Sequence, residues 1–140
     1  MTGVLVALEQ RLRDGGFTGP IALGVLPDEP DAILVLREYP VEPGLDFSAS
    51  GLPALERFGV QMVARGNARD GVVVPEAMAW SAYRILAGRH ARVQVGGDTH
   101  AIDYIFPNHA PAPLGEDDLF RPVYVLNWTI QRWGTLEATA

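Results

Sequence analysis

Apolar residues recur at helical spacing near the start of the chain, over residues 2–14. The apolar stripe of this segment consists of Leu5, Leu8 and Leu12. Thr2 is suited to cap the N-terminus, because its hydroxyl can accept a hydrogen bond from a backbone N–H of the first turn. Gly15-Gly16 ends the segment, since glycine adopts the left-handed C-terminal conformation at little cost. The pattern therefore predicts an amphipathic helix.

A second helical pattern covers Val74 to Ala87, with Pro75 in the first turn and Gly88 as the stop. Its predicted apolar stripe is Met78, Ala82 and Ile85, flanked by Ala79 and Leu86. At 100° per residue, Trp80 lies about 160° from Ala82. If the stripe covers a sheet, Trp80 must find cover elsewhere.

Strand patterns occupy most of the remaining apolar segments. Ala32 to Glu38 is a run of Ile, Leu and Val, which is typical of a strand buried on both faces. Phe58 to Arg65 alternates, with Phe58, Val60, Met62 and Ala64 on one side. Ala101 to Phe106 and Val123 to Arg132 are the last two predicted strands. In the second of these, Tyr124, Leu126, Trp128 and Ile130 share one face.

Two long segments, Tyr39 to Pro53 and Asn108 to Pro122, are rich in proline and predict loops. The order of elements is helix, strands, helix, strands. Few segments of the chain can serve as the crossover connections that parallel strands need. We therefore expect an α+β fold: a mostly antiparallel sheet with two helices packed on it, forming a single domain over residues 1–140.

Composition and charge narrow the possible functions. The chain has 140 residues, no cysteine and a net charge of -6, from 11 basic and 17 acidic residues. A disulfide framework, a thiolate metal site and a cysteine nucleophile are thereby excluded. Tight nucleic-acid binding needs a basic patch, and the basic residues here are scattered. No apolar run reaches transmembrane length and no signal peptide is recognisable, so no membrane association is expected.

Candidate chemical sites are few. His100 with Asp98 and Asp103 could be considered as metal ligands, but they are better interpreted as polar residues of a loop and a strand edge. The run Glu116-Asp117-Asp118 lacks the spacing of a calcium loop and is better interpreted as a solvated acidic loop. No phosphate-binding glycine motif or nucleophile elbow occurs. We therefore predict a protein that is not an enzyme and needs no catalytic residue, cofactor or metal.

Four stretches of the chain resemble the tail-terminator (minor capsid) family of long-tailed bacteriophages in their order and spacing. They are Leu23-Gly24 with 26–28 and 30–31; Glu38-Tyr39-Pro40 with Pro43; Glu56 to Arg65; and Leu114-Gly115, Asp117, Arg121, Tyr124 and Asn127-Trp128. Three places depart from the family pattern. Phe58 stands where proline is usual, Trp128 stands where phenylalanine is commoner, and the tip at 116–120 contains no glycine.

The resemblance implies a virion structural protein, present in the tail or neck and assembled in the host cytoplasm. The resemblance implies a homo-oligomeric, hexameric ring that caps the tail tube and joins it to the head connector. Its partners would be the tail tube protein and the head-tail connector or stopper protein, with DNA passing through the lumen without specific binding. The alternatives are another phage neck or tail-completion ring subunit, or a small metabolic or nucleotide-handling enzyme.

Aromatic and apolar residues outside the predicted core stripes are candidates for the subunit interface. Tryptophan is enriched at interface hot spots and is costly to leave exposed. The predicted interface residues are Trp80, Tyr83, Leu45, Phe47, Leu52 and Trp133.

Overall fold

The computed structural model describes residues 3–39, 46–47, 53–89, 91–95, 98–102 and 104–133. Helix α1 spans Val4–Asp14 and helix α2 spans Val73–Leu86. The strands are β1 (Ile21–Leu23), β2 (Ile33–Tyr39), β3 (Asp46–Phe47), β4 (Pro53–Arg65), β5 (Ala91–Val95), β6 (Asp98–Ile102), β7 (Tyr104–Pro107), β8 (Ala112–Glu116) and β9 (Pro122–Trp133).

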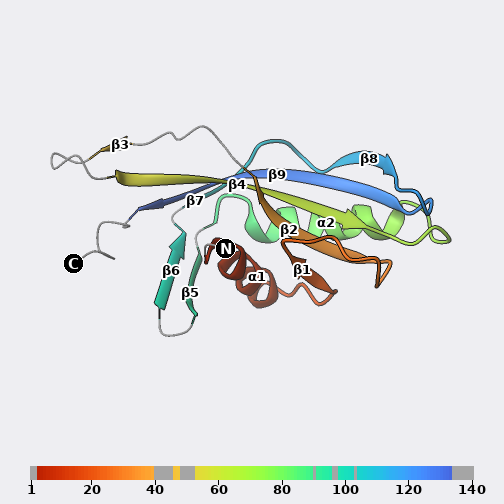
Figure 1. The fold of residues 1–140 in the computed structure, drawn as a ribbon, viewed down its shortest axis with the longest axis horizontal. Helices are drawn as coiled ribbons and strands as arrows, with labels where there is room; N and C mark the ends of the chain where they lie inside the picture. The colour runs from red at the N-terminus through yellow and green to blue at the C-terminus, as the bar shows by residue number, and fades with distance from the viewer. Residues whose placement is uncertain are drawn as a thin grey trace.

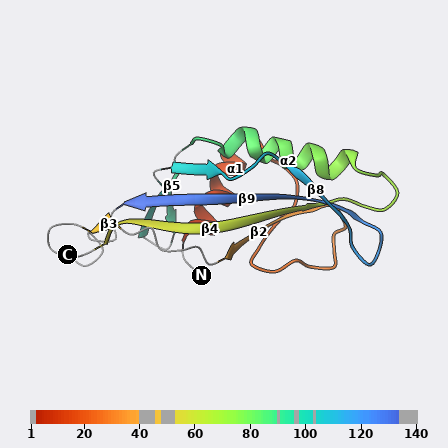
Figure 2. The same ribbon diagram turned by 90° about the horizontal axis from the view of Figure 1, so that it is seen from above.

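The fold is α+β, as predicted. A seven-stranded sheet has the order β1-β2-β4-β9-β7, with β3 paired to β4 and β8 paired to β9. Only the β1–β2 pair is parallel, and the remaining pairs are antiparallel. The long strands β4 and β9 form the centre, paired from Leu55–Trp133 to Arg65–Val123. Both helices cover the same face of this sheet (Figures 1 and 2).

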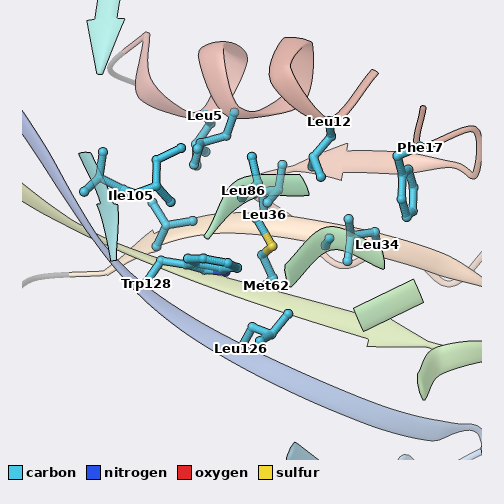
Figure 3. Packing of buried hydrophobic residues seen from close by; sticks show 14 of the residues in the cluster. Leu5, Leu12, Phe17, Leu34, Leu36, Met62, Leu86, Ile105, Leu126 and Trp128 are labelled. Atoms are coloured by element: carbon cyan, nitrogen blue, oxygen red, sulfur yellow. The ribbon is translucent and has the colours of Figure 1, made fainter. Parts of the chain in front are cut away.

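The core lies between the helices and the sheet (Figure 3). Leu5 and Leu12 of α1 point toward the sheet (Figure 3), and Leu5, Leu8 and Leu12 are all buried, so the predicted stripe of this helix is confirmed. The predicted inward faces of β4 and β9 are also confirmed, because their residues belong to this cluster. These residues are Val60, Met62, Ala64, Tyr124, Leu126, Trp128 and Ile130. Phe58 packs against its edge.

The buried face of α2 is rotated from the predicted one. Its buried residues are Pro75, Ala79, Ala82 and Leu86, whereas Met78 and Ile85 are only partly buried. Small residues on this face let the helix approach the sheet closely. The Tyr124 hydroxyl donates a 2.8 Å hydrogen bond to Glu76 in the first turn of α2, which fixes this end of the helix to β9.

Three strand predictions need correction. Residues 101–106 are not one strand, because β6 pairs with β5 in a separate two-stranded sheet while β7 pairs with β9. Strand β5 was not predicted, although Gly96-Gly97 in the sequence beside Val95 and Asp98 is a typical two-residue hairpin connection. The predicted loop 108–122 contains β8, whose irregular pairing with β9 between Pro113 and Gly115 hides the alternation that would reveal a strand.

Candidate interaction surface

A buried arginine organises the end of the molecule where β4 stops. The Arg65 side chain leaves the face of β4 opposite the helices and is 1% exposed. Its guanidinium donates hydrogen bonds to the backbone carbonyls of Pro27, Asp28, Pro30 and Asp31, at 2.7 to 3.2 Å. These bonds hold the loop between β1 and β2 against the sheet. Burial lowers the pKa of Arg65, and the neighbouring Arg121 lowers it further.

A second arginine connects the same loop to the tip of the β8–β9 hairpin. Arg121 donates through Nη1 to the Asp28 carbonyl at 2.7 Å and forms an ion pair with Asp31 at 3.2 Å. Its Nε donates to Asp117 at 2.7 Å. Burial opposes the charge of Arg121, but the hydrogen bonds to Asp117 and Asp31 raise its pKa overall. The two arginines therefore fasten two loops that are far apart in sequence.

The hairpin tip is closed by the carboxylate of Asp117. One oxygen accepts hydrogen bonds from the backbone N–H of Leu119 at 3.0 Å and of Arg121 at 2.9 Å. The Phe120 N–H donates to the Asp117 carbonyl at 2.9 Å. Burial raises the pKa of the Asp117 carboxyl, but the hydrogen bonds from Arg121 and Leu119 outweigh burial and lower it. Asp117 is therefore a structural residue of the turn, whereas Glu116 and Asp118 are exposed, as predicted for an acidic loop.

The turn presents two apolar side chains to solvent. Leu119 is 60% exposed and Phe120 is 71% exposed. Phe120 also has a φ of 60°, a left-handed conformation that is unfavourable for a bulky residue. Strain of this kind persists only where the surrounding hydrogen bonds enforce it, and it is commonest at functional positions. Phe120 lies in the stretch 116–120, which lacks the glycine that the resemblance leads us to expect.

The loops at this end of the molecule, to the right in Figure 1, and the elements next to them carry exposed apolar residues. They are Val25, Leu26, Val72, Val73, Leu114, Leu119 and Phe120. The loops carrying them meet closely, since the Gly66 N–H donates to the Pro122 carbonyl and a Cβ on Gly66 would lie 2.6 Å from Pro75. Exposed apolar side chains on neighbouring loops of a folded domain are a candidate protein–protein contact surface. We call this set of residues the loop-end surface.

An apolar groove of about 390 Å³ runs beside α2. One wall is the segment between α1 and β1, with Phe17 and Pro20, and the other is the side of α2 that carries Val74, Ala77, Met78 and Ser81. Arg13 stands at the rim, where its guanidinium donates to the carbonyls of Phe17 at 3.1 Å and Gly19 at 2.7 Å. The groove is therefore lined mainly by apolar residues, with one arginine beside it.

Trp80 lies on the outward side of α2, one turn after Ala77, and is partly buried. Its ring contacts Tyr83 edge-on at 5.4 Å, and the Arg84 guanidinium lies 5.7 Å from the ring centre. Tyr83 continues inward to Trp128, with ring centres 6.1 Å apart, and packs against the core. Both predicted interface residues on α2 are therefore partly buried, with Tyr83 packed against the core and Trp80 against Tyr83.

The other predicted interface residues are only partly described. Phe47 belongs to β3, which pairs with β4, and Trp133 ends β9, where it pairs with Leu55. For both residues the description is limited to the backbone. Leu45 and Leu52 lie outside the described residues.

The candidate metal ligands fall on a part of the chain of which only the backbone of β6 is described. Asp98 and His100 lie in β6, while Asp103 lies outside the described residues. The ring nitrogens of His109 lie 2.7 Å from the Ala110 carbonyl and 3.0 Å from the Asn127 amide. Among the described residues no group of three or more His, Asp or Glu side chains could hold a metal ion.

The sequence did not predict the loop-end surface. The loops that carry it are held together by Arg65 and Arg121, and nothing in the order of residues marks these two arginines as buried. The alternation of β4 predicted only that Arg65 faces away from the helices. One usable signal was the turn-rich run 27–31, which needs partners for its backbone carbonyls once it is folded against the sheet.

Neither described helix has the length and apolar character needed to cross a lipid bilayer. No family model matches the chain, and no curated protein matches it. Nine chains of solved structures match. One of these structures, whose name states no activity, is 17% identical in sequence with a TM-score of 0.56, covering 94% of this chain and 95% of its own. This similarity shows the fold alone.

Proposed function

We propose that this chain is a virion structural protein of the tail-terminator type, a ring subunit that caps a tail tube and joins it to the head connector. The observation that carries the proposal is the loop-end surface, where apolar side chains are held outward by a hydrogen-bonded framework. A rigid scaffold that exposes Leu119 and Phe120 is suited to binding other proteins rather than to chemistry. The order of sequence features along the chain supplies the resemblance to this family.

The acidic character of the chain supports the same proposal. A ring through which DNA passes must not hold phosphates, and every basic contact would strengthen binding by releasing counterions. With 17 acidic and 11 basic residues, a neutral or acidic lumen is readily built. The arginines buried at the loop end, Arg65 and Arg121, are occupied by carbonyls and carboxylates of their own chain.

Mass measurement under native conditions, with and without purified tail tubes, tests this function. The expected result is a closed oligomer, either free or on tube ends, whose formation is concentration dependent. A protein that stays monomeric in both conditions would refute the proposal. Location of the subunit in assembled particles by electron microscopy would distinguish a tail terminator from another neck or tail-completion ring.

Trp80→Ala tests whether the outward side of α2 takes part in assembly. Its ring packs on the partly buried Tyr83 and near the exposed Arg84, so we expect the thermal midpoint of the free subunit to move little. If the indole is an interface anchor, its removal should weaken association by about 2 kcal/mol or more. Concentration-dependent native mass spectrometry measures the second quantity and thermal unfolding the first. A large loss of monomer stability with unchanged assembly would make Trp80 a core residue.

A further inference from the structure

The loop-end surface and the groove beside α2 have complementary chemistry. The tip of the β8–β9 hairpin carries the exposed apolar pair Leu119 and Phe120, flanked by the exposed carboxylates of Glu116 and Asp118. The groove is lined by apolar residues and has Arg13 at its rim. Arg84, stacked near Trp80, lies on the adjoining outward side of the same helix. An apolar projection flanked by carboxylates and an apolar groove with an arginine beside it therefore occur on one chain.

The sizes of the two features also agree. An apolar cavity of about 150 Å³ accommodates a benzene molecule. The groove, at about 390 Å³, has room for a phenyl ring together with a leucine side chain. The tip cannot fill the groove of its own subunit, because Leu119 and Phe120 are both mostly exposed.

We propose that the Leu119–Phe120 tip of one copy of this chain inserts into the groove beside α2 of the next copy. The two surfaces are different, so the contact is head-to-tail and leaves a free tip at one end and a free groove at the other. Contacts of this kind close into a ring when the rotation between copies divides a full turn. The inference rests on the proposed ring function and identifies the surfaces that join its subunits.

The strain at Phe120 is consistent with this role. A left-handed Phe is unfavourable in the free subunit, yet the Asp117 and Arg121 hydrogen bonds hold it in place. The tip is thereby ordered before association, which reduces the entropy lost when it enters a partner.

Cross-linking tests the contact directly, because the chain contains no cysteine. One preparation carries Phe120→Cys and the other carries Ala77→Cys, and the two are mixed under mild oxidation. The expected product is a disulfide-linked dimer containing one copy of each variant. The matched control replaces Phe120→Cys by Phe106→Cys, an exposed aromatic position on β7. Cross-linking no greater than in this control would overturn the proposal.

Variants of the tip and of the groove measure how much each surface contributes to the association of subunits. Phe120→Asn removes the ring but tolerates the left-handed backbone, and Ala77→Arg fills the groove from an exposed helical position. Each should weaken association by about 30-fold or more, as for an interface hot spot. Phe106→Asn, the same chemical change elsewhere, should leave association unchanged. Because each variant keeps one intact surface, a mixture of Phe120→Asn and Ala77→Arg should form dimers that do not grow.

The outcomes separate this inference from the proposed function. Rings that form equally well from wild type, Phe120→Asn and Ala77→Arg would refute the tip-and-groove contact and leave the ring function standing. A specific cross-link from a protein that forms open chains and does not cap tail tubes would support the contact and refute the tail-terminator function.

Discussion

The helix–sheet core of this protein is stabilised differently from its loop end, the region where the loop 24–32 meets the tip of the β8–β9 hairpin. In the core, Trp128, Met62 and Leu86 are fully buried among apolar neighbours from both helices and the central strands. At the loop end, the buried groups are Arg65 and Arg121, which bind backbone carbonyls and carboxylates, while the apolar side chains remain outside. One region gains its stability from removing apolar surface from water and the other from charge-assisted hydrogen bonds.

This difference explains how one small domain can be rigid and still expose apolar residues. A loop held by apolar burial would need its own Leu and Phe side chains inside. Here the arginines fix the loops through their backbone, so Leu119 and Phe120 are free to point outward. The loop end can therefore serve as a contact surface without weakening the core.

The largest expected effect is in the core. Trp128→Ala should lower the free energy of unfolding by about 3–5 kcal/mol, because it removes the largest fully buried side chain and leaves a cavity. Chemical denaturation measures this change. Trp128→Phe is the comparison variant, because the indole Nε1 of Trp128 has no hydrogen-bond partner among the described residues. Removing that unsatisfied donor offsets part of the lost apolar area, so Phe should be far better tolerated than Ala. Equal losses for the two variants would contradict this account.

The second-largest loss of stability is expected at the loop end, where Arg65 is buried. Arg65→Lys should lower the free energy of unfolding by about 2–3 kcal/mol, because one ammonium cannot satisfy four carbonyls arranged around a planar guanidinium. Hydrogen exchange should show the loss as faster opening of residues 27–31, with little change in the core helices. If exchange instead increased uniformly across the chain, the loop end would not be a separately stabilised region.

A smaller, pH-dependent effect is expected at Asp117. Its pKa is lowered in the folded chain, so the stabilisation is complete above the ordinary value of 3.8 and is lost as the pH falls through the lower folded value. Asp117→Asn should remove about 1–2 kcal/mol at neutral pH and flatten the pH dependence of stability below about pH 4. Unfolding measured across this pH range is the test. Asp118→Asn, at an exposed neighbouring position, should leave the profile unchanged, and a matching effect of both variants would refute the assignment.

The smallest expected effect has the opposite sign. Phe120→Asn should raise the stability of the free subunit by about 0.5–1 kcal/mol, because asparagine adopts the left-handed conformation more readily than phenylalanine. Thermal unfolding of the monomer measures this gain. A destabilised monomer would mean that the Phe120 ring contributes to folding rather than to contacts with other chains.

Hydrophobic periodicity determined much of the fold. The stripe of α1 and the inward faces of β4 and β9 follow directly from spacing, because a side chain's face depends only on its position along a regular helix or strand. Strands β5 and β8 were not predicted from the sequence. The first is short and lies outside the main sheet, and the second is interrupted by a bulge. In both, the local pattern carries too few residues to reveal the pairing.

The loop end was decided by tertiary structure. Arg65 and Arg121 are 56 positions apart in sequence order, and their common partners Asp28 and Asp31 belong to a third segment. Their burial depends on the β4–β9 register, which places Arg65 beside the start of β9, and on the fold of the loop 27–31 around the guanidinium. The rotation of α2 was also set by contact, because the closest approach to the sheet selects the small Ala79 and Ala82 over the larger Met78. Sequence periodicity fixes which residues share a face, whereas the packing of one element on another fixes which face is inside and which polar groups must be satisfied there.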